Sequence, residues 1–257
     1  MRPTRFFDLK DIALSFSVRG TARMAVSVAA AAAAVISIAI AAVTASPAVA
    51  QVAPTASEAA SYTGLHAAAQ QGDVAKIERL AASKADLNVR DGNGRTPLHV
   101  ASFAKQRHAI HALVMAGADI HLLDKDRYDG VTIASVADDD DTLRVLLSLG
   151  ASAKLTTSRY DGTALIAAAH LGHDGVVRQL IAAGAPLDRV NNLHWTALIE
   201  SIVLGNGGPR HQEVLRALLA AGASTQLADR QGNTPLALAR SRGYATMVQT
   251  LEKAGAK

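Results

Sequence analysis

Two copies of one tetrapeptide carry side chains that could do chemistry. Arg-Tyr-Asp-Gly occurs at residues 127–130 and again at residues 159–162 of this 257-residue chain. Tyrosine and aspartate can take part in proton transfer and arginine can hold an anion, so the pair could mark a duplicated active site. The pair could instead belong to a longer internal repeat, in which case the place of each copy within that repeat decides its role.

Two further groups of side chains could hold a metal ion. The run Asp138–Asp141 offers oxygen ligands for a divalent cation, but it lacks the glycine and closing glutamate of a calcium-binding loop. We therefore interpret it as a solvated acidic turn. His108 and His111 could share one helix face, yet a zinc site needs further ligands. We predict no metal, no cofactor and no catalytic residue, and the alternative is a metal-binding, small-ligand-binding or enzyme-accessory function with its site at one of these groups.

A glycine-rich stretch is the remaining candidate. Asn206, Gly207, Gly208, Pro209 and Arg210 follow one another, and such a stretch can cradle a phosphate when it joins a strand to a helix. Here it falls between two expected helices, so the phosphate interpretation is poor. We expect a protruding loop that could contact a partner, because binding residues are often carried on loops.

The first fifty residues differ from the rest in composition. Five arginine and lysine side chains precede an apolar run at residues 25–44, which is followed by Pro47 and by Ala48-Val49-Ala50. This pattern is typical of a secretory signal peptide, and we expect cleavage after Ala50 and a linker at residues 51–57. The run is also long enough to span a bilayer, so an uncleaved membrane anchor is the alternative. If translation began at Met24 instead, the chain would lack the basic residues that precede the apolar run.

The charge balance of the chain depends on that leader. The chain has 26 Lys and Arg against 22 Asp and Glu, and removal of the first fifty residues leaves 21 against 20. A nearly neutral mature chain gives no support to nucleic-acid binding, which requires a clustered basic surface. The absence of cysteine excludes disulfides and thiol chemistry.

The elements that position these groups repeat along the chain at a period of about 33 residues. One series is the small pair before a turn: Lys84-Ala85, Gly117-Ala118, Gly150-Ala151, Gly184-Ala185, Gly222-Ala223 and Gly255-Ala256. A second series is the apolar residue that opens a helix: Leu65, Leu98, Val131, Leu165, Leu198 and Leu236. Both series take one extra residue near 152–160 and five extra between 198 and 222. Repeats of this length indicate a solenoid of stacked units.

Each unit carries the markers of two short helices. A threonine precedes the first helix at positions 63, 96, 163, 196 and 234, where a side-chain oxygen can cap it. Pro97 and Pro235 fit the first helical turn, and Gly72, Gly172 and Gly243 fit its end. Apolar residues at helical spacing follow in the second helix, as at Ile110 and Leu113.

The segments NGRTPLHVAS (93–102), TGLHAAAQQGD (63–73) and GNTPLALARSRGY (232–244) resemble ankyrin repeats. The resemblance covers residues 58–257 and implies an all-α solenoid of about six helix-turn-helix units joined by β-turns or hairpin loops. We place the units at about 58–90, 91–123, 124–157, 158–190, 191–228 and 229–257. The resemblance also implies that His66 and His99 form hydrogen bonds between units. The 206–210 insertion resembles a feature of exported bacterial ankyrin-repeat proteins.

The repeat register separates the two tetrapeptides. Gly130 lies one residue before its helix-opening Val131, whereas Gly162 lies three residues before Leu165. Asp129 of the first copy therefore takes the capping position that Thr163 takes in the next unit. The copies are not equivalent, so a duplicated active site loses its main support.

The turns between units are the predicted binding region. The resemblance places them along the concave side of the stack, and Arg, Tyr and Trp are frequent interface anchors. The candidates are Arg95, Arg127, Tyr128, Arg159, Tyr160, His194, Trp195 and Arg230. We therefore predict a non-catalytic, monomeric scaffold that binds another protein and has no membrane contact after leader removal. We expect it in the periplasm of a Gram-negative bacterium or secreted from it.

Overall fold

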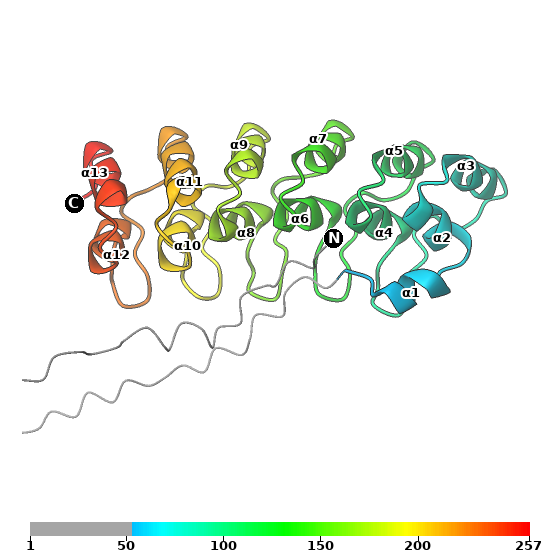
Figure 1. Cartoon of the computed structure of the whole chain (residues 1–257), viewed down its shortest axis with the longest axis horizontal. Helices are drawn as coiled ribbons and strands as arrows, with labels where there is room; N and C mark the ends of the chain where they lie inside the picture. Colours follow the sequence, from blue (N-terminus) through cyan, green and yellow to red (C-terminus); the bar gives the residue numbers. More distant parts are fainter. Residues whose placement is uncertain (1–52) are drawn as a thin grey trace, which may run out of the picture. The chain divides into compact units, whose positions relative to one another are not determined.

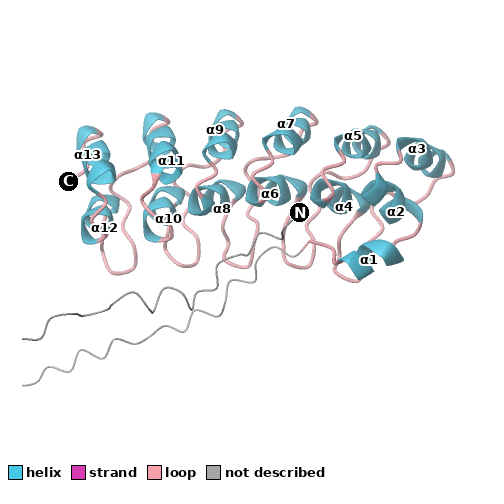
Figure 2. Cartoon of the chain, in the orientation of Figure 1, coloured by secondary structure: helices cyan, strands magenta, loops and turns pink. Residues whose placement is uncertain are grey.

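The structure, a computed structural model, describes residues 53–257; the predicted signal peptide, its cleavage site and residues 51–52 of the linker lie outside the described residues. All regular secondary structure in this part is helical, as expected (Figure 2). The helices are α1 (Ala56–Ser61), α2 (Gly64–Gln71), α3 (Val74–Ala82), α4 (Pro97–Phe103), α5 (Arg107–Met115), α6 (Gly130–Val136), α7 (Asp140–Ser148), α8 (Ala164–Leu171), α9 (Asp174–Ala182), α10 (Ala197–Val203), α11 (Pro209–Ala220), α12 (Pro235–Ser241) and α13 (Ala245–Lys253).

After α1, the helices form six consecutive pairs arranged in two layers (Figure 1). The first helices of the pairs, α2 to α12 by even numbers, form one layer, and the second helices, α3 to α13, form the other. Each helix packs against its counterparts in the neighbouring pairs and against its own partner. The turns between pairs extend from the first-helix layer on the side away from the second-helix layer. None of the described helices combines the length and the hydropathy that crossing a membrane requires.

The apolar residues of the repeat lie where the period places them. Leu98, Leu165 and Leu198 of the first helices are at most 1% exposed, and Leu113 and Leu180 of the second helices are fully buried. Burial of such a side chain contributes about 1.5–3 kcal/mol. One continuous core therefore runs through all six units.

Side-chain oxygens cap the N-termini of most of the first helices. Thr163, Thr196 and Thr234 each accept a hydrogen bond from the backbone N–H three residues later. Asp129 does the same for α6, accepting from the Thr132 N–H at 2.8 Å, as the shifted register predicted. The side chain of Thr63 makes no such bond at the start of α2, so that expected cap is missing.

Polar side chains form hydrogen bonds between neighbouring units. His66 Nε2 lies 2.9 Å from the Arg95 carbonyl and His99 Nε2 lies 2.9 Å from the Tyr128 carbonyl, which confirms the implied role of both histidines. His211 Nε2 reaches the carbonyl of His170 at 2.9 Å. Each contact gives a main-chain carbonyl a partner from the adjacent unit, so the stack is held by hydrogen bonds as well as by its core.

Two glycines make room for these contacts. Gly72 and Gly172 follow α2 and α8 with φ of 71° and 72°, the left-handed conformation that ends a helix. A Cβ atom on Gly172 would lie 2.8 Å from the His211 ring, and one on Gly72 would lie 2.5 Å from the Gln106 amide. Glycine is needed here both for the backbone turn and for the close approach of the next unit.

Candidate partner-binding surface

The turns between units are built on one recurring pattern. A carboxylate or amide oxygen at the start of the turn accepts hydrogen bonds from two later backbone N–H groups. Asp91, Asp124, Asn191 and Asp229 each fill this place, at distances of 2.8–3.0 Å. The turn between the third and fourth units is different, because an isolated antiparallel bridge joins Thr157 to Gly162 there. These bonds hold the backbone of each turn in one conformation.

Main-chain hydrogen bonds join successive turns to one another. The Lys125 N–H donates to the Asn93 carbonyl at 3.1 Å, and the Ser158 N–H donates to the Arg127 carbonyl at 3.0 Å. The Asn192 N–H donates to the Tyr160 carbonyl at 2.9 Å. The turns of the second to fifth units therefore form one connected edge.

Three of the predicted arginine anchors bond along this edge. Arg127 Nη1 donates to Asp161 Oδ1 at 3.2 Å, and Arg159 pairs with Asp126. Arg230 donates to the Asn192 carbonyl. The side chains of Arg127 and Arg159 remain 47% and 59% exposed, so each can also meet a partner. Their first role is to connect neighbouring turns.

Arg95 is placed differently from the other turn candidates. It is only 4% exposed, lies 3.6 Å from both Glu58 and Asp91 carboxylate oxygens, and stacks over the Phe103 ring at 5.8 Å. The expectation that it projects from a turn is therefore corrected. Arg95 and Phe103 are eight residues apart in the sequence. This separation gives no indication that the guanidinium stacks on the ring.

The remaining turn candidates differ in exposure. His194 is exposed and has φ of 65°, whereas Tyr128, Tyr160 and Trp195 are half-buried. Burial raises the pKa of the Tyr128 hydroxyl. A half-buried aromatic ring with a free edge can anchor a partner, so the structure leaves these three as the better-placed candidates on the turns.

The insertion does not form the protruding loop that was expected. α11 begins at Pro209, so Pro209 and Arg210 lie in an extended first turn of that helix, and Gly208 is its N-cap. Proline is well suited to this place because its missing N–H costs nothing there. Gly207 lies against Tyr244 of the next unit, where an added Cβ would come within 2.6 Å of the ring. The insertion packs on its neighbours and adds a turn of helix.

Arg210 also connects the insertion to two earlier units. Its Nη2 atom donates to both carboxylate oxygens of Asp138 at 3.0 and 2.8 Å, and its Nε atom donates to Asp174 at 3.2 Å. Burial tends to raise the pKa of Asp174, but hydrogen bonds from Arg178 and Arg210 outweigh it and hold that pKa below its usual range. One guanidinium therefore links the third, fourth and fifth units.

A row of side chains on the first-helix layer was missed in the sequence. The position seven residues after each helix cap holds Phe103 in α4, Val136 in α6 and Val203 in α10, and Leu204 follows Val203. The first three are half-buried and Leu204 is 37% exposed. We call these four residues the first-helix stripe. The seven-residue spacing of the first three from their caps was a usable signal, but exposure cannot be read from a helical period.

Two ionisable groups beside the stripe are uncharged at neutral pH. His170 holds the stripe position in α8, and burial first, then the nearby His211 and His173, lowers its pKa to about 4. Burial raises the pKa of Glu200 in α10 to about 8, although the Asn191 amide donates to this carboxyl at 2.7 Å. Their closest atoms lie 3.6 Å apart, but with these pKa values they form no ion pair at pH 7. The middle of the first-helix layer therefore carries no charge from either group.

The acidic run behaves as a turn and helix start. Asp138 has a left-handed φ of 52°, Asp139 caps α7, and Asp140 and Asp141 lie in its first turn. Acidic side chains are favoured at a helix N-terminus. Within residues 53–257, no group of three or more His, Cys, Asp or Glu side chains is arranged to hold a metal ion. That the acidic run binds no cation remains a prediction.

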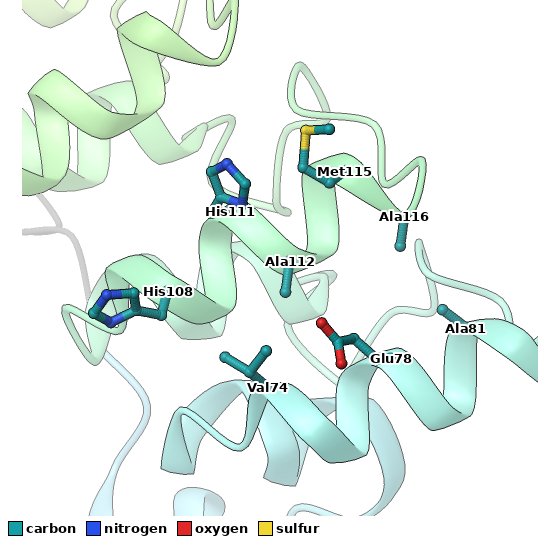
Figure 3. Close-up of a pocket in the computed structure, with 8 residues that line it drawn as sticks. All are labelled: Val74, Glu78, Ala81, His108, His111, Ala112, Met115 and Ala116. Atoms are coloured by element: carbon teal, nitrogen blue, oxygen red, sulfur yellow. The ribbon is translucent and has the colours of Figure 1, made fainter.

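The second-helix layer carries a shallow groove of about 670 Å³ between α3 and α5 (Figure 3). It is lined by Val74, Glu78 and Ala81 of α3 and by His108, His111, Ala112, Met115 and Ala116 of α5. The groove lies on the layer opposite the turns, so it is separate from the first-helix stripe.

Comparison with known proteins identifies the repeat. A family model described as ankyrin repeats (3 copies) matches residues 131–229, and one described as ankyrin repeats (many copies) matches residues 65–114. YahD of Escherichia coli (strain K12), a protein named for ankyrin repeats, is 38% identical over 190 residues, which cover 74% of this chain and 94% of YahD.

Solved structures agree with this match. The chain is similar to the crystal structure of an ankyrin repeat domain (ABAYE2397) from Acinetobacter baumannii AYE, with a TM-score of 0.71 and 45% identity over 75% of this chain and 98% of that one. It is also similar to the ankyrin repeat domain of Bcl-3, described as a member of the IkappaB protein family. That comparison has a TM-score of 0.69 and 28% identity over 77% of this chain and 88% of that one.

Proposed function

Because this chain belongs to the ankyrin-repeat family, we propose that it is an exported, non-catalytic scaffold that binds another protein through its first-helix layer and turns. An ankyrin-repeat scaffold typically mediates protein–protein interaction, and this coarse role follows from the family. The finer statements concern the binding surface, the export and the absence of catalysis.

The first-helix stripe is the observation that carries the proposed surface. Its four apolar side chains are partly exposed on α4, on α6 and at the end of α10, and His170 of the intervening α8 and Glu200 of α10 are uncharged at pH 7. Apolar surface that water still reaches gains free energy when a partner covers it. The half-buried Tyr128, Tyr160 and Trp195 lie at the turns and would form the aromatic edge of the same surface.

Rigidity supports this function. Turns held by internal hydrogen bonds, and linked to each other by main-chain bonds, lose little freedom when a partner binds. Affinity rises when the ordering cost is met before binding, so a preformed surface suits a binding scaffold. We propose a monomer, since each unit needs only its neighbours for packing.

The first experiment compares two matched substitutions in the third unit. Val136→Glu places a charge in the stripe, and Ser148→Glu places one at an exposed position of α7 in the other layer. We expect proteins retained by the wild-type bait from an envelope extract to be retained by Ser148→Glu and lost with Val136→Glu. Equal retention by both variants, with helicity unchanged, would move the binding surface away from the stripe.

A further inference from the structure

The outer face of α5 differs from that of α7 and α11. In α7, Asp141 pairs with Arg144 at 2.8 Å, and in α11, Glu213 pairs with Arg216 at 2.6 Å. The residues one 33-residue period before Asp141 and Arg144 are His108 and His111 of α5. Two imidazoles therefore stand in α5 where two other second helices carry a solvated ion pair.

A third change accompanies the two histidines. The ninth residue after the cap position is Met115 in α5, where the other second helices carry alanine, serine or lysine. Met115 is 69% exposed, whereas Met247, the other methionine of the described part, is fully buried. A solvated thioether gains nothing from packing, so burial does not explain its presence on this face.

Helix geometry places the three side chains on one face. Residues at i, i+3 and i+7 of an α-helix fall within about 60° of one another around the axis. His108, His111 and Met115 follow this spacing on successive turns of α5, and all three line the groove between α3 and α5 (Figure 3). His111 is three residues from His108 and four from Met115, and side chains at these spacings have Cβ atoms about 5–6 Å apart, so His111 can share a bound ion with each of the other two.

The two imidazoles are not used by the fold. His66, His99, His173 and His211 each have a ring nitrogen on a main-chain carbonyl of another unit. Within residues 53–257 the rings of His108 and His111 make no hydrogen bond or ion pair, and both residues are exposed. Their ring nitrogens are free to coordinate.

The ligand set selects the kind of ion. Two imidazoles and a thioether are soft to intermediate ligands, a combination that suits monovalent copper and gives little to Ca²⁺ or Mg²⁺. Zinc would need a further His, Cys or carboxylate ligand, and the described part has no such cluster of three. We propose that His108, His111 and Met115 form a surface binding site for copper(I).

The walls of the groove suit a monovalent cation. Val74, Ala112 and Ala116 give the groove an apolar floor, and Glu78 of α3 lies on the opposite wall and supplies a negative charge. The site lies on the second-helix layer, so copper occupancy leaves the first-helix stripe open. The inference therefore stands apart from the proposed protein-binding function.

The test is competition for copper(I) between a chromogenic chelator and the full chain purified from the cell envelope, under a reductant such as ascorbate. We expect one copper(I) per chain. Met115→Leu keeps the volume and removes the sulfur, and we expect it to weaken binding by about tenfold or more. His108→Ala with His111→Ala should abolish binding. His121→Ala is the control, because this exposed histidine lies outside α5, and it should bind copper(I) as the wild type does.

Circular dichroism of each variant checks that the fold is intact, since α5 residues are exposed at all three positions. Undiminished copper(I) binding by the His108→Ala, His111→Ala variant would overturn the site. Full binding by Met115→Leu would overturn the role of the thioether. Failure of the wild-type chain to take copper(I) from the chelator at equal concentration would overturn the proposal as a whole.

Discussion

Arg127 donates to the carboxylate of Asp161 at 3.2 Å, and this contact joins the two Arg-Tyr-Asp-Gly tetrapeptides to each other. The arginine of the second copy, Arg159, pairs with Asp126, the residue just before the first copy. The repeated tetrapeptide thus contributes to two ion pairs that join neighbouring turns. The side chains that suggested a duplicated active site connect two units of a stack.

The Arg127–Asp161 pair should contribute little to stability. Both side chains are nearly half exposed, and exposed ion pairs contribute about 0.2–1 kcal/mol. In a double-mutant cycle with Arg127→Gln and Asp161→Asn, we expect a coupling energy in that range, falling further in high salt. Asparagine tolerates the left-handed φ of 54° at this position, so backbone strain should not confuse the result.

Urea unfolding of the four proteins measures this coupling. Arg189→Gln is the control partner for Asp161→Asn, because Arg189 is exposed and takes part in none of the ion pairs of residues 53–257. Its effect should add to that of Asp161→Asn. A coupling free energy above about 2 kcal/mol would mean that the ion pair is needed to hold the two turns together.

Glu200 should make the fold less stable as the pH rises. Its pKa is about 8 in the folded chain against 4.5 as the ordinary value, because burial disfavours the charged form. Between these values the folded state keeps a proton that the unfolded state has lost, so stability falls with rising pH, by about 5 kcal/mol at most. Glu200→Gln should remove this slope and be a few kcal/mol more stable than the wild type at pH 8.

The difference in unfolding free energy between wild type and Glu200→Gln, measured from pH 4 to pH 9, checks this account. It should grow above pH 4.5 and level off above pH 8. Glu78→Gln, at an exposed glutamate of α3, should show no such growth. His170 acts at acidic pH. Its pKa is about 4 in the folded chain against an ordinary value of 6.5, so the unfolded state takes up a proton first and the stability of the fold decreases as the pH falls below 6.5. A difference that does not change with pH would mean that Glu200 is ionised in the folded chain.

The repeat and most of its helix markers could be predicted from sequence. The series of Leu98, Leu165 and Leu198 gave the period, and the capping role of Asp129 followed from the register. These features are local or periodic, so one unit predicts the next. The structure confirms the all-helical solenoid and the bonding of His66 and His99 between units.

The predictions that failed concern contacts between residues far apart in the sequence. The sequence could not place Asp138 beside Arg210, 72 residues later, so the insertion was taken for a free loop. Pro209 was the overlooked local marker, because proline favours the first turn of a helix. The turn arginines were taken for free anchors because their acidic partners lie one repeat away, as Asp161 does from Arg127.

Deletion of residues 206–210 should therefore cost stability. The spacing of the repeat alone predicts that Gly205 can be joined to His211 without harm to the fold. The structure adds the Gly207–Tyr244 packing and the bonds of Arg210, which the deletion removes. We expect helicity to fall by about one turn and the free energy of unfolding to fall by about 2–4 kcal/mol.

Arg210→Ala separates the two contributions of the insertion. Its side chain is 53% exposed, so we expect this variant to lose about 1 kcal/mol and to retain full helicity by circular dichroism. Thermal and urea unfolding of both variants are compared with the wild type. A deletion variant as stable as the wild type would restore the interpretation of a solvated loop.

The proposed export predicts a defined N-terminus. We expect the protein recovered from the cell envelope to begin at Gln51, because Pro47 and Ala48-Val49-Ala50 mark a cleavage site. N-terminal sequencing and intact mass give the answer. A full-length species that requires detergent for extraction would support the tethered alternative, and a species beginning at Met24 would relocate the start of translation.

The binding surface is tested most directly by photo-crosslinking in living cells. A photoreactive amino acid is placed at Leu204 of the first-helix stripe or at Ala220, an exposed residue of α11 in the same unit but in the other helix layer. We expect a discrete crosslinked product with another protein from position 204 and none from position 220. Crosslinking from position 220 with none from position 204 would contradict the claim that the first-helix layer binds the partner.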